Sequence, residues 1–299
     1  MNVQRPAGFQ NPSKSYDSPL SDSRESLDRL KQTELNLLSK FIECCQNMQL
    51  PYFLMDGSML GAVRHQGFIP WDDDIDVGMF RADYETFLAK AQELLPSYCF
   101  VQCLETEPDY PYNFAKIRDS RTTFIETSVK NCRINHGVFI DLFPLDYYPV
   151  SRTEQKEFDR KNRLLSLRIR DAFTLPEENR HSPIAEAGAK SVSKVLCLKY
   201  PTVRAALEAR EALFKSVSKS TLVANHCSAW GKKETVPAEW YGEGTSAVFE
   251  GLTVQIPASY DKWLSQVYGD YMQLPPIEKR VTHHFTERID MERPYTFYR

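Results

Sequence analysis

Four aspartates fall within five positions of this chain, at Asp72, Asp73, Asp74 and Asp76. Apolar side chains flank and interrupt them, at Trp71, Ile75 and Val77. Gathering so much negative charge beside residues that favour burial is costly unless one or more cations compensate it. The stretch therefore predicts a metal site.

The spacing of the acids indicates which of them bind the metal. Asp74 and Asp76 project from the same face of a strand, because side chains alternate with a period of two. Such a pair suits Mg²⁺, or Mn²⁺ in its place, with water and substrate phosphates as further ligands. Asp141 is the single acid of an apolar run, FIDLF, and is expected to complete a two-metal clamp from a neighbouring strand. Asp72 and Asp73 are expected to orient water or hold the turn.

Residues upstream and downstream of the acids are suited to phosphate. Gly57 allows a tight turn after the apolar run YFLM, and Ser58 is expected to cap a short helix whose N-terminus would seat phosphate oxygens. Arg64 is a further possible contact. Lys116 and Arg118 share one face of a predicted strand and could grip phosphate, or form ordinary salt bridges with the acids.

Three histidines are candidate acid/base groups near neutral pH, at His136, His283 and His284. A structural hydrogen-bonding role is the alternative for each of them.

The acidic stretch also has three other interpretations: a solvated turn, a calcium-binding loop and a glycosyltransferase metal motif. A solvated acidic turn does not explain the apolar flanks or Asp141. A calcium-binding EF-hand loop beginning at Asp72 would place Val77 where glycine is needed and Asp83 where glutamate is needed, which excludes it. An Asp-x-Asp glycosyltransferase survives on spacing, although it does not account for Gly57, Ser58 or Asp141.

The remaining pattern is that of an α/β protein. Periodic apolar residues predict helices at about 23–50, 58–65, 81–95, 184–199, 202–219 and 260–271, and one after Pro149 that opens on a capping box of Ser151 and Glu154. Short apolar or alternating runs predict strands at 52–55, 75–79, 99–104, 113–117, 122–125, 138–143 and 249–256.

The pattern divides the chain into three parts. Residues 1–21 are expected to be a flexible tail, 22–150 a catalytic core, and 151–299 a mainly helical part packed on it.

Composition narrows the classes of partner. With 37 Lys and Arg against 40 Asp and Glu, a nucleic-acid partner is not expected. Seven scattered cysteines form no zinc motif and indicate a reduced, cytoplasmic protein. No signal-peptide or membrane-spanning pattern occurs. The basic stretch 152–170 could nevertheless hold the chain at the inner membrane face, if it is more than a solvated helix face.

The order of the motifs resembles a known superfamily. A Gly-Ser turn, then an Asp-x-Asp strand, then a third acid is the order found in nucleotidyltransferases typified by polymerase beta. More specifically, DGSMLGAVRHQGFIPWDDDIDVGM resembles the signature of the LicD family, which includes fukutin and the fukutin-related protein. YNFAKIRDSRTTF, HGVFIDLFPLD and VYGDYMQLP are also similar, so the resemblance spans about residues 30–285.

The resemblance implies a nucleotidyltransferase fold, with a small mixed sheet flanked by helices. It implies transfer of a phospho-alcohol, most often phosphocholine from CDP-choline, to a hydroxyl of a cell-surface glycan such as lipopolysaccharide or teichoic acid, or of its lipid-linked precursor. Asp74 and Asp76 would then hold Mg²⁺ across the diphosphate, and Asp141 would share a metal and accept the hydroxyl proton. The alternatives are nucleotidyl transfer from an NTP and a non-catalytic glycan-binding module.

Overall fold

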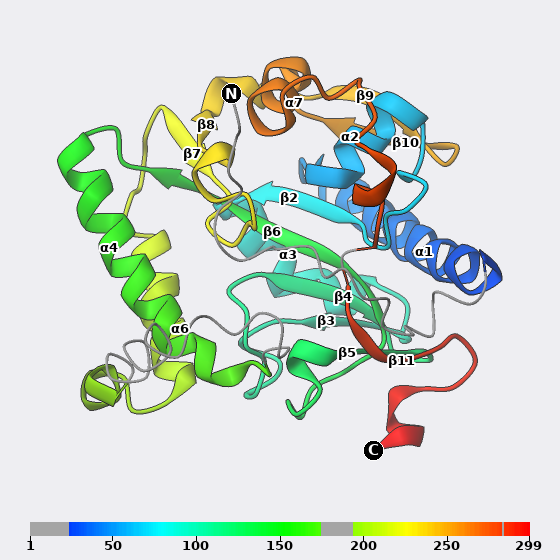
Figure 1. Ribbon diagram of the computed structural model, residues 1–299, viewed down its shortest axis with the longest axis horizontal. Helices are drawn as coiled ribbons and strands as arrows, with labels where there is room; N and C mark the ends of the chain where they lie inside the picture. The colour runs from blue at the N-terminus through cyan, green and yellow to red at the C-terminus, as the bar shows by residue number, and fades with distance from the viewer. Residues whose placement is uncertain (1–23, 175–193, 283) are drawn as a thin grey trace.

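A computed structural model describes residues 24–174, 194–282 and 284–299. The tail expected at 1–21, most of the helix expected at 184–199 and His283 lie outside the described residues. The fold is mixed α/β, as predicted, with a seven-stranded sheet at its centre (Figure 1).

The sheet orders its main strands β1-β2-β6-β4-β3, and β7 and β8 extend it from the far end of β6. Strands β2 and β6 are parallel, whereas the other neighbours are antiparallel, so the sheet is mixed. The strands are β1 (Phe53–Leu54), β2 (Asp76–Phe80), β3 (Cys99–Gln102), β4 (Ala115–Asp119), β6 (Val138–Tyr148), β7 (Leu222–Ala224) and β8 (Val236–Pro237).

Two helices bury one face of this sheet. Helices α1 (Arg24–Met48) and α3 (Arg81–Leu94) pack on each other and on the central strands, and α3 lies behind the sheet in Figure 1. Because side chains alternate along a strand, Ile140 and Leu142 of β6 enter this core, while Asp141 projects from the opposite face. One face of the sheet is therefore structural, and the other is left for chemistry.

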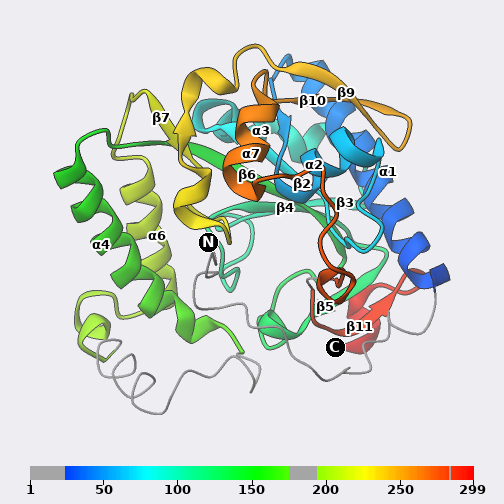
Figure 2. The same ribbon diagram turned by 45° about the horizontal axis from the view of Figure 1, so that its top comes forward.

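The part beyond residue 150 contributes strands as well as helices. Helix α4 (Arg152–Ile169) packs on α6 (Val203–Phe214) at one edge of the sheet, as Figures 1 and 2 show. This part also supplies β7, β8 and β11 (Thr286–Asp290), and β11 pairs with β5 (Thr123–Glu126). The C-terminal part thus completes sheets that the core begins.

Three details of the predicted elements are corrected. The strand expected at 249–256 is a hairpin of β9 (Thr245–Phe249) and β10 (Leu252–Ile256), because Glu250 and Gly251 both have positive φ and form a tight turn. The last predicted helix, α7 (Tyr260–Tyr268), ends early at Gly269, which has φ of 77°. Ser151 makes no side-chain cap at the start of α4.

Helix α2 (Asp56–His65) begins earlier than the sequence predicted. Its N-cap is Met55, and Ser58 lies within the first turn instead of capping it. Among the described residues, no helix combines the length and apolar character needed to cross a bilayer.

Arg81 joins the core to the C-terminal part. From the first turn of α3 it pairs with Asp146 of β6 through Nη2 and Oδ2 (2.5 Å), and it also pairs with Glu211 of α6. The Asp146 side chain is only 3% exposed. Removing the Arg81 guanidinium would therefore leave the buried carboxylate of Asp146 without its ion-pair partner.

We expect Arg81→Met to destabilise the protein by roughly 3–5 kcal/mol, because one partner of a buried ion pair is lost. Urea unfolding at pH 7 measures the change. Lys161→Met, which removes the exposed pair with Glu157, is the matched control and should leave the unfolding midpoint where it is. Equal effects of the two substitutions would show that Arg81 does not join the two parts.

Candidate active site

The centre of the site is a pair of aspartates on neighbouring parallel strands. Asp76 opens β2 and stands directly opposite Asp141 of β6 in the register of the sheet. The register is fixed just before Asp76, where the backbone N–H of Asp141 donates to the carbonyl of Ile75 (2.9 Å). The two strands therefore bring together carboxylates that are far apart in the sequence, and Asp141 comes from a neighbouring strand, as expected. Asp74, which was expected to share a strand face with Asp76, precedes the strand, because β2 begins at Asp76.

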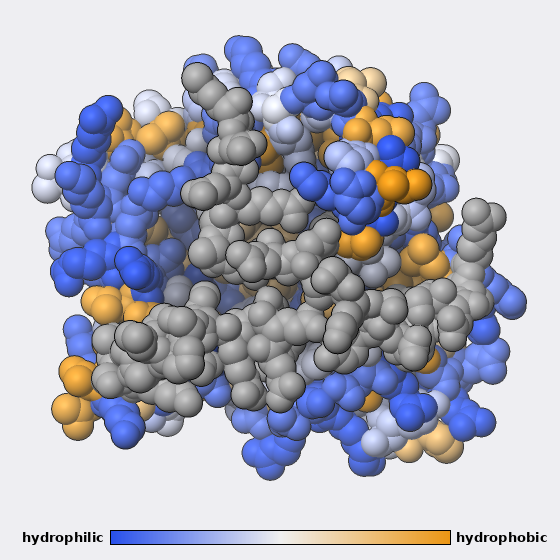
Figure 3. All heavy atoms as spheres, in the orientation of Figure 1, coloured by the Kyte–Doolittle hydropathy of each residue, from blue (hydrophilic) through white to orange (hydrophobic). Residues whose placement is uncertain are grey.

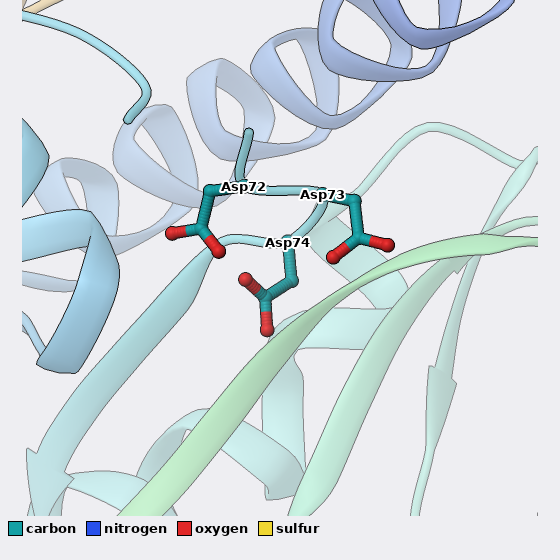
Figure 4. A group of neighbouring side chains, drawn as sticks. All are labelled: Asp72, Asp73 and Asp74. Carbon is teal, nitrogen blue, oxygen red and sulfur yellow. The ribbon is translucent and has the colours of Figure 1, made fainter. Parts of the chain in front are cut away.

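A second group of carboxylates lies on the turn that leads into β2. Asp72, Asp73 and Asp74 each offer an oxygen, and these oxygens lie within 4.8 Å of one another. Figure 4 shows the three side chains projecting from this one turn. The three oxygens therefore form a compact acidic group beside the strand that carries Asp76.

Oxygens in this arrangement can share one hard cation. Ligands at 2.0–2.6 Å from one ion lie up to roughly 4–5 Å apart. Asp72 and Asp73 are thus in a position to bind metal directly, which the sequence analysis did not assign to them.

Gly57 and Ser58 position the acidic turn and the start of β2. A Cβ atom on Gly57 would lie 2.5 Å from Oδ2 of Asp72, so a larger residue at this position would displace that carboxylate. The hydroxyl of Ser58 accepts a hydrogen bond from the backbone N–H of Asp76 (2.9 Å). The first turn of α2 therefore positions two of the aspartates, and its positive end lies beside Asp72.

The acids raise one another's pKa. Burial, followed by repulsion from Asp74, raises the pKa of Asp72 and of Asp76 well above the usual range. Burial raises the pKa of Asp141 as well, although the Lys116 ammonium opposes the shift. A carboxylate group this crowded favours a bound cation, since a cation would relieve both the desolvation and the repulsion.

Lys116 and Arg118 form a buried chain of ion pairs behind Asp141. Nζ of Lys116 lies 2.8 Å from Oδ1 of Asp141 and 3.7 Å from Glu126, and Arg118 holds the other oxygen of Glu126 at 3.1 Å. Burial opposes ionisation of Glu126, but Lys116 and Arg118 lower its pKa to about 2.

Arg118 itself has no exposed surface, and each of its guanidinium nitrogens is bonded to Gln102, Gly137 or Glu126. The geometry thus gives Arg118 a positioning role in place of the predicted phosphate contact. For Lys116, which touches Asp141, phosphate binding remains a prediction.

His284 and Glu34 approach the acidic turn from distant parts of the chain. Nδ1 of His284 lies 3.3 Å from Asp73, and although burial lowers its pKa, Asp73 and the other acids raise it to about 10. Glu34 of α1 is buried, and burial and the three turn aspartates raise its pKa well above normal. His284 thus supplies a positive charge that the sequence analysis had considered only as an acid/base group.

Asp56 and Glu234 form a buried carboxyl pair beside Asp76. Burial raises the pKa of Asp56 to about 7 and that of Glu234 well above normal, and one carboxyl oxygen of each side chain has no hydrogen-bond partner among the described residues. Repulsion from Asp74 adds to the shift of Asp56. Asp56 also adopts φ of 46°, a strained backbone for a residue other than glycine. Strained backbone and buried ionisable groups cluster at functional sites, so the pair is a candidate part of the site.

Two residues singled out in the sequence are bonded elsewhere. Nη1 of Arg64 donates to the carbonyl of Tyr271 (2.6 Å), which ties α2 to the segment after α7, and its contact with phosphate remains a prediction. His136 is fully buried, its Nε2 lies 3.1 Å from the carbonyl of Cys132, and burial lowers its pKa to about 4. His136 is therefore neutral at pH 7 and is not protonated there to act as an acid.

The donor set fits a hard divalent cation. Every side chain in the compact group is a carboxylate, which suits Mg²⁺ or Mn²⁺, whereas zinc favours imidazole and thiolate. Asp72, Asp73 and Asp74 could hold one ion, and Asp76 with Asp141 offers oxygens for a second. Asp74 belongs to the predicted ligand set and to the observed group.

Comparison with known proteins places this site in a family. The model of the family described as "LicD/FKTN/FKRP, nucleotidyltransferase domain" matches residues 49–181, which include Asp56 and all five aspartates discussed above. The description of that family names a nucleotidyltransferase domain, and the matched residues of this chain contain the acidic site.

A relative from Haemophilus influenzae, named lipopolysaccharide cholinephosphotransferase LicD, is 30% identical over 254 residues, which cover 85% of this chain and 94% of the relative. The chain belongs to the LicD family and is a transferase. Uncharacterized proteins of Rickettsia typhi (34% identical over 83 residues, 26% of each chain) and Rickettsia prowazekii (47% over 49 residues, 16% of this chain and 17% of the relative) match shorter stretches.

We expect Asp56→Asn to stabilise the metal-free protein at pH 8 by ~1–3 kcal/mol. The folded pKa of Asp56, about 7, lies above its unfolded value of about 4, so the folded state loses stability as pH rises between these values. Asparagine removes that loss and tolerates positive φ. Urea unfolding with a chelator at pH 8 and pH 4 measures the difference, which should vanish at pH 4.

Asp109→Asn, at an exposed aspartate, is the control and should show no such dependence on pH. A variant at position 56 that is less stable than the wild type at pH 8 would contradict the description of the site as electrostatically crowded.

Proposed function

We propose that this chain transfers phosphocholine from CDP-choline to a hydroxyl of a cell-surface glycan or its lipid-linked precursor, and releases CMP. We further propose a nucleotidyltransferase fold and dependence on Mg²⁺ or Mn²⁺. The observation that carries the proposal is the register of β2 and β6, which sets Asp76 against Asp141 beside the acidic turn. The name and the coverage of the Haemophilus relative support the choice of phosphocholine and of a lipopolysaccharide-type acceptor.

The reaction exchanges one P–O bond for another. The acceptor oxygen bonds to the phosphorus nearer the choline, the bond from that phosphorus to the CMP phosphate breaks, and the hydroxyl proton passes to a carboxylate. A bound metal would neutralise charge on the diphosphate and on the leaving CMP. Asp141 is suited to take the proton, and Lys116, at 2.8 Å, holds its carboxylate in place.

An aromatic group next to Asp141 supports choline as the alcohol. Phe143 follows Asp141 on the same strand face, and its ring lies 4.6 Å from that of Phe114. The ring of Tyr112 lies 4.8 Å from that of Phe114 and 5.3 Å from that of Phe173, tilted against both. Nζ of Lys116 lies 5.6 Å from the rings of Tyr112 and Phe114, so these faces already attract a cation. A quaternary ammonium two carbons from the transferred phosphate suits this environment.

A cytoplasmic location agrees with this function. All seven cysteines are free thiols, as is usual in the reducing cytoplasm.

The two alternatives, nucleotidyl transfer from an NTP and a glycan-binding module, differ from the proposal in what is released: pyrophosphate in the first case and nothing in the second.

We expect CDP-choline, Mg²⁺ and a lipopolysaccharide or oligosaccharide acceptor to yield CMP, and a chelator to stop the reaction. Asp76→Asn and Asp141→Asn should each lower kcat by at least about 10³-fold, because each removes charge from the metal-binding and proton-accepting group. Asp109→Asn is the control. Release of pyrophosphate from NTPs, or CMP release unaffected by either substitution, would overturn the mechanism.

We expect Phe143→Leu and Tyr112→Leu to raise KM for CDP-choline by about 5–30-fold, because cation–π attraction is lost. KM for CDP-glycerol or CDP-ribitol should change little. Phe249→Leu, in the β9–β10 hairpin, controls for the loss of a buried ring. If both substitutions weaken all donors equally, the aromatic group does not select choline.

A further inference from the structure

The outer face of α4 is a continuous basic stripe. Its residues follow one another at intervals of four, four, three and seven, so they lie on one side of the helix. The first four are exposed and the last is half-buried: Arg152, Lys156, Arg160, Arg163 and Arg170. The opposite side of the helix packs on the protein through Phe158, Leu165 and Ile169. The stripe therefore points away from the core.

One acid of α4, Asp159, lies beside this stripe, four positions before Arg163, whereas Glu154 and Glu157 lie on other sides of the helix. Glu157 pairs with Lys161, and Asp159 bonds to Tyr148 and pairs with Lys232. Within the part of the chain that the structure describes, none of Arg152, Lys156, Arg160 and Arg163 forms a salt bridge. A solvated helix face usually mixes both signs of charge, whereas this face carries four exposed basic residues and one half-buried acid, Asp159.

A short apolar surface lies near the carboxyl end of α4. Residues 194–199 are helical, and Val195 and Leu198, three positions apart, are 67% and 89% exposed. Lys194 and Lys199 flank them and are exposed as well. Large aliphatic side chains this exposed, between lysines, are typical of a surface that enters the headgroup region of a bilayer.

Arg168 fixes this short helix to the carboxyl end of α4. Its side chain is buried, Nε donates to the carbonyl of Tyr200, and Nη2 donates to that of Pro201, both at 3.0 Å. Figures 1 and 2 both place 194–199 beside the lower end of α4, at the same edge of the molecule. In Figure 3 hydrophilic side chains cover the α4 edge, with an apolar patch below them.

We propose that the outer face of α4, together with Val195 and Leu198, is a docking surface for a bilayer with anionic headgroups. Guanidinium and ammonium groups would pair with lipid phosphates, and the two aliphatic side chains would enter the interface between headgroups and acyl chains. The proposal extends the proposed function, because a lipid-linked glycan acceptor is presented at such a surface. The site lies on the face of the central sheet, and α4 packs at the edge of that sheet, so docking leaves Asp76 and Asp141 free of the lipid.

Vesicle co-sedimentation of the full chain tests the proposal. We expect binding to phosphatidylcholine vesicles that contain phosphatidylglycerol, weak binding to pure phosphatidylcholine, and loss of binding at high salt. Each basic residue near such a surface contributes about fivefold in affinity. Replacing Arg152, Lys156, Arg160 and Arg163 by Glu should therefore weaken binding by at least about 100-fold. Val195→Ser with Leu198→Ser should weaken it less, and should do so also at high salt.

The matched control reverses four exposed lysines off this surface, at Lys90, Lys161, Lys262 and Lys279, and should bind as the wild type does. Circular dichroism and urea unfolding establish that each variant is folded. If the wild type does not bind anionic vesicles, or if the α4 variant and the control lose binding equally, the proposal is wrong. Binding that soluble lipid-free glycan abolishes would assign the stripe to the acceptor instead, which also overturns it.

Parallel assays separate this proposal from the proposed function. The α4 variant should release CMP from CDP-choline at the wild-type rate when the acceptor is soluble and lipid-free. Asp76→Asn should bind anionic vesicles as the wild type does while it fails to turn over. Vesicle binding without CMP release from the wild type would overturn the proposed function alone.

Discussion

The structure depends on bringing many carboxylates together where water is scarce. Asp76 and Asp141 meet across two parallel strands, the turn before β2 adds three more acids, and Glu34, Asp56 and Glu234 enclose them. Mutual repulsion and lost hydration would push such an assembly apart, so the surrounding fold has to hold it. A helix-covered sheet does so, because each acid projects from backbone that a buried core fixes on the other side.

Positively charged groups approach the acids from several directions, but together they do not neutralise the carboxylates. Lys116 holds Asp141, His284 holds Asp73, and Lys31 of α1 donates to the carbonyls of Ile69 and Pro70 on the acidic turn. These contacts fix the geometry of the acids but leave a large excess of carboxylate. The excess is what distinguishes a site that takes a cation and a diphosphate from a set of structural ion pairs, in which charges are matched.

How much of this arrangement the sequence predicts depends on the range of the interactions. Asp76 and Asp141 were predicted because strand periodicity and one acid within an apolar run are local signals. Asp56, Glu34 and Glu234 were missed because their neighbours come from tertiary packing. Glu34 lies among the polar residues of a long amphipathic helix, and nothing local marks it as buried. Ser58 was assigned to a helix cap because Ser commonly caps helices, whereas here its hydroxyl serves a neighbouring strand. The aromatic group beside Asp141 could not be found among many rings until β4 and β6 were paired.

The pairing of distant segments also sets an order for assembly on the ribosome. The end of β6 that follows the site residues remains an open sheet edge until 222–224 arrive, and β5 lacks its partner until 286–290 are made. An exposed edge strand is a template for association with other chains. The nascent protein thus carries its acidic site on a sheet that stays unfinished until β7 and β8 are made, and the many like charges there would oppose the approach of neighbouring nascent chains.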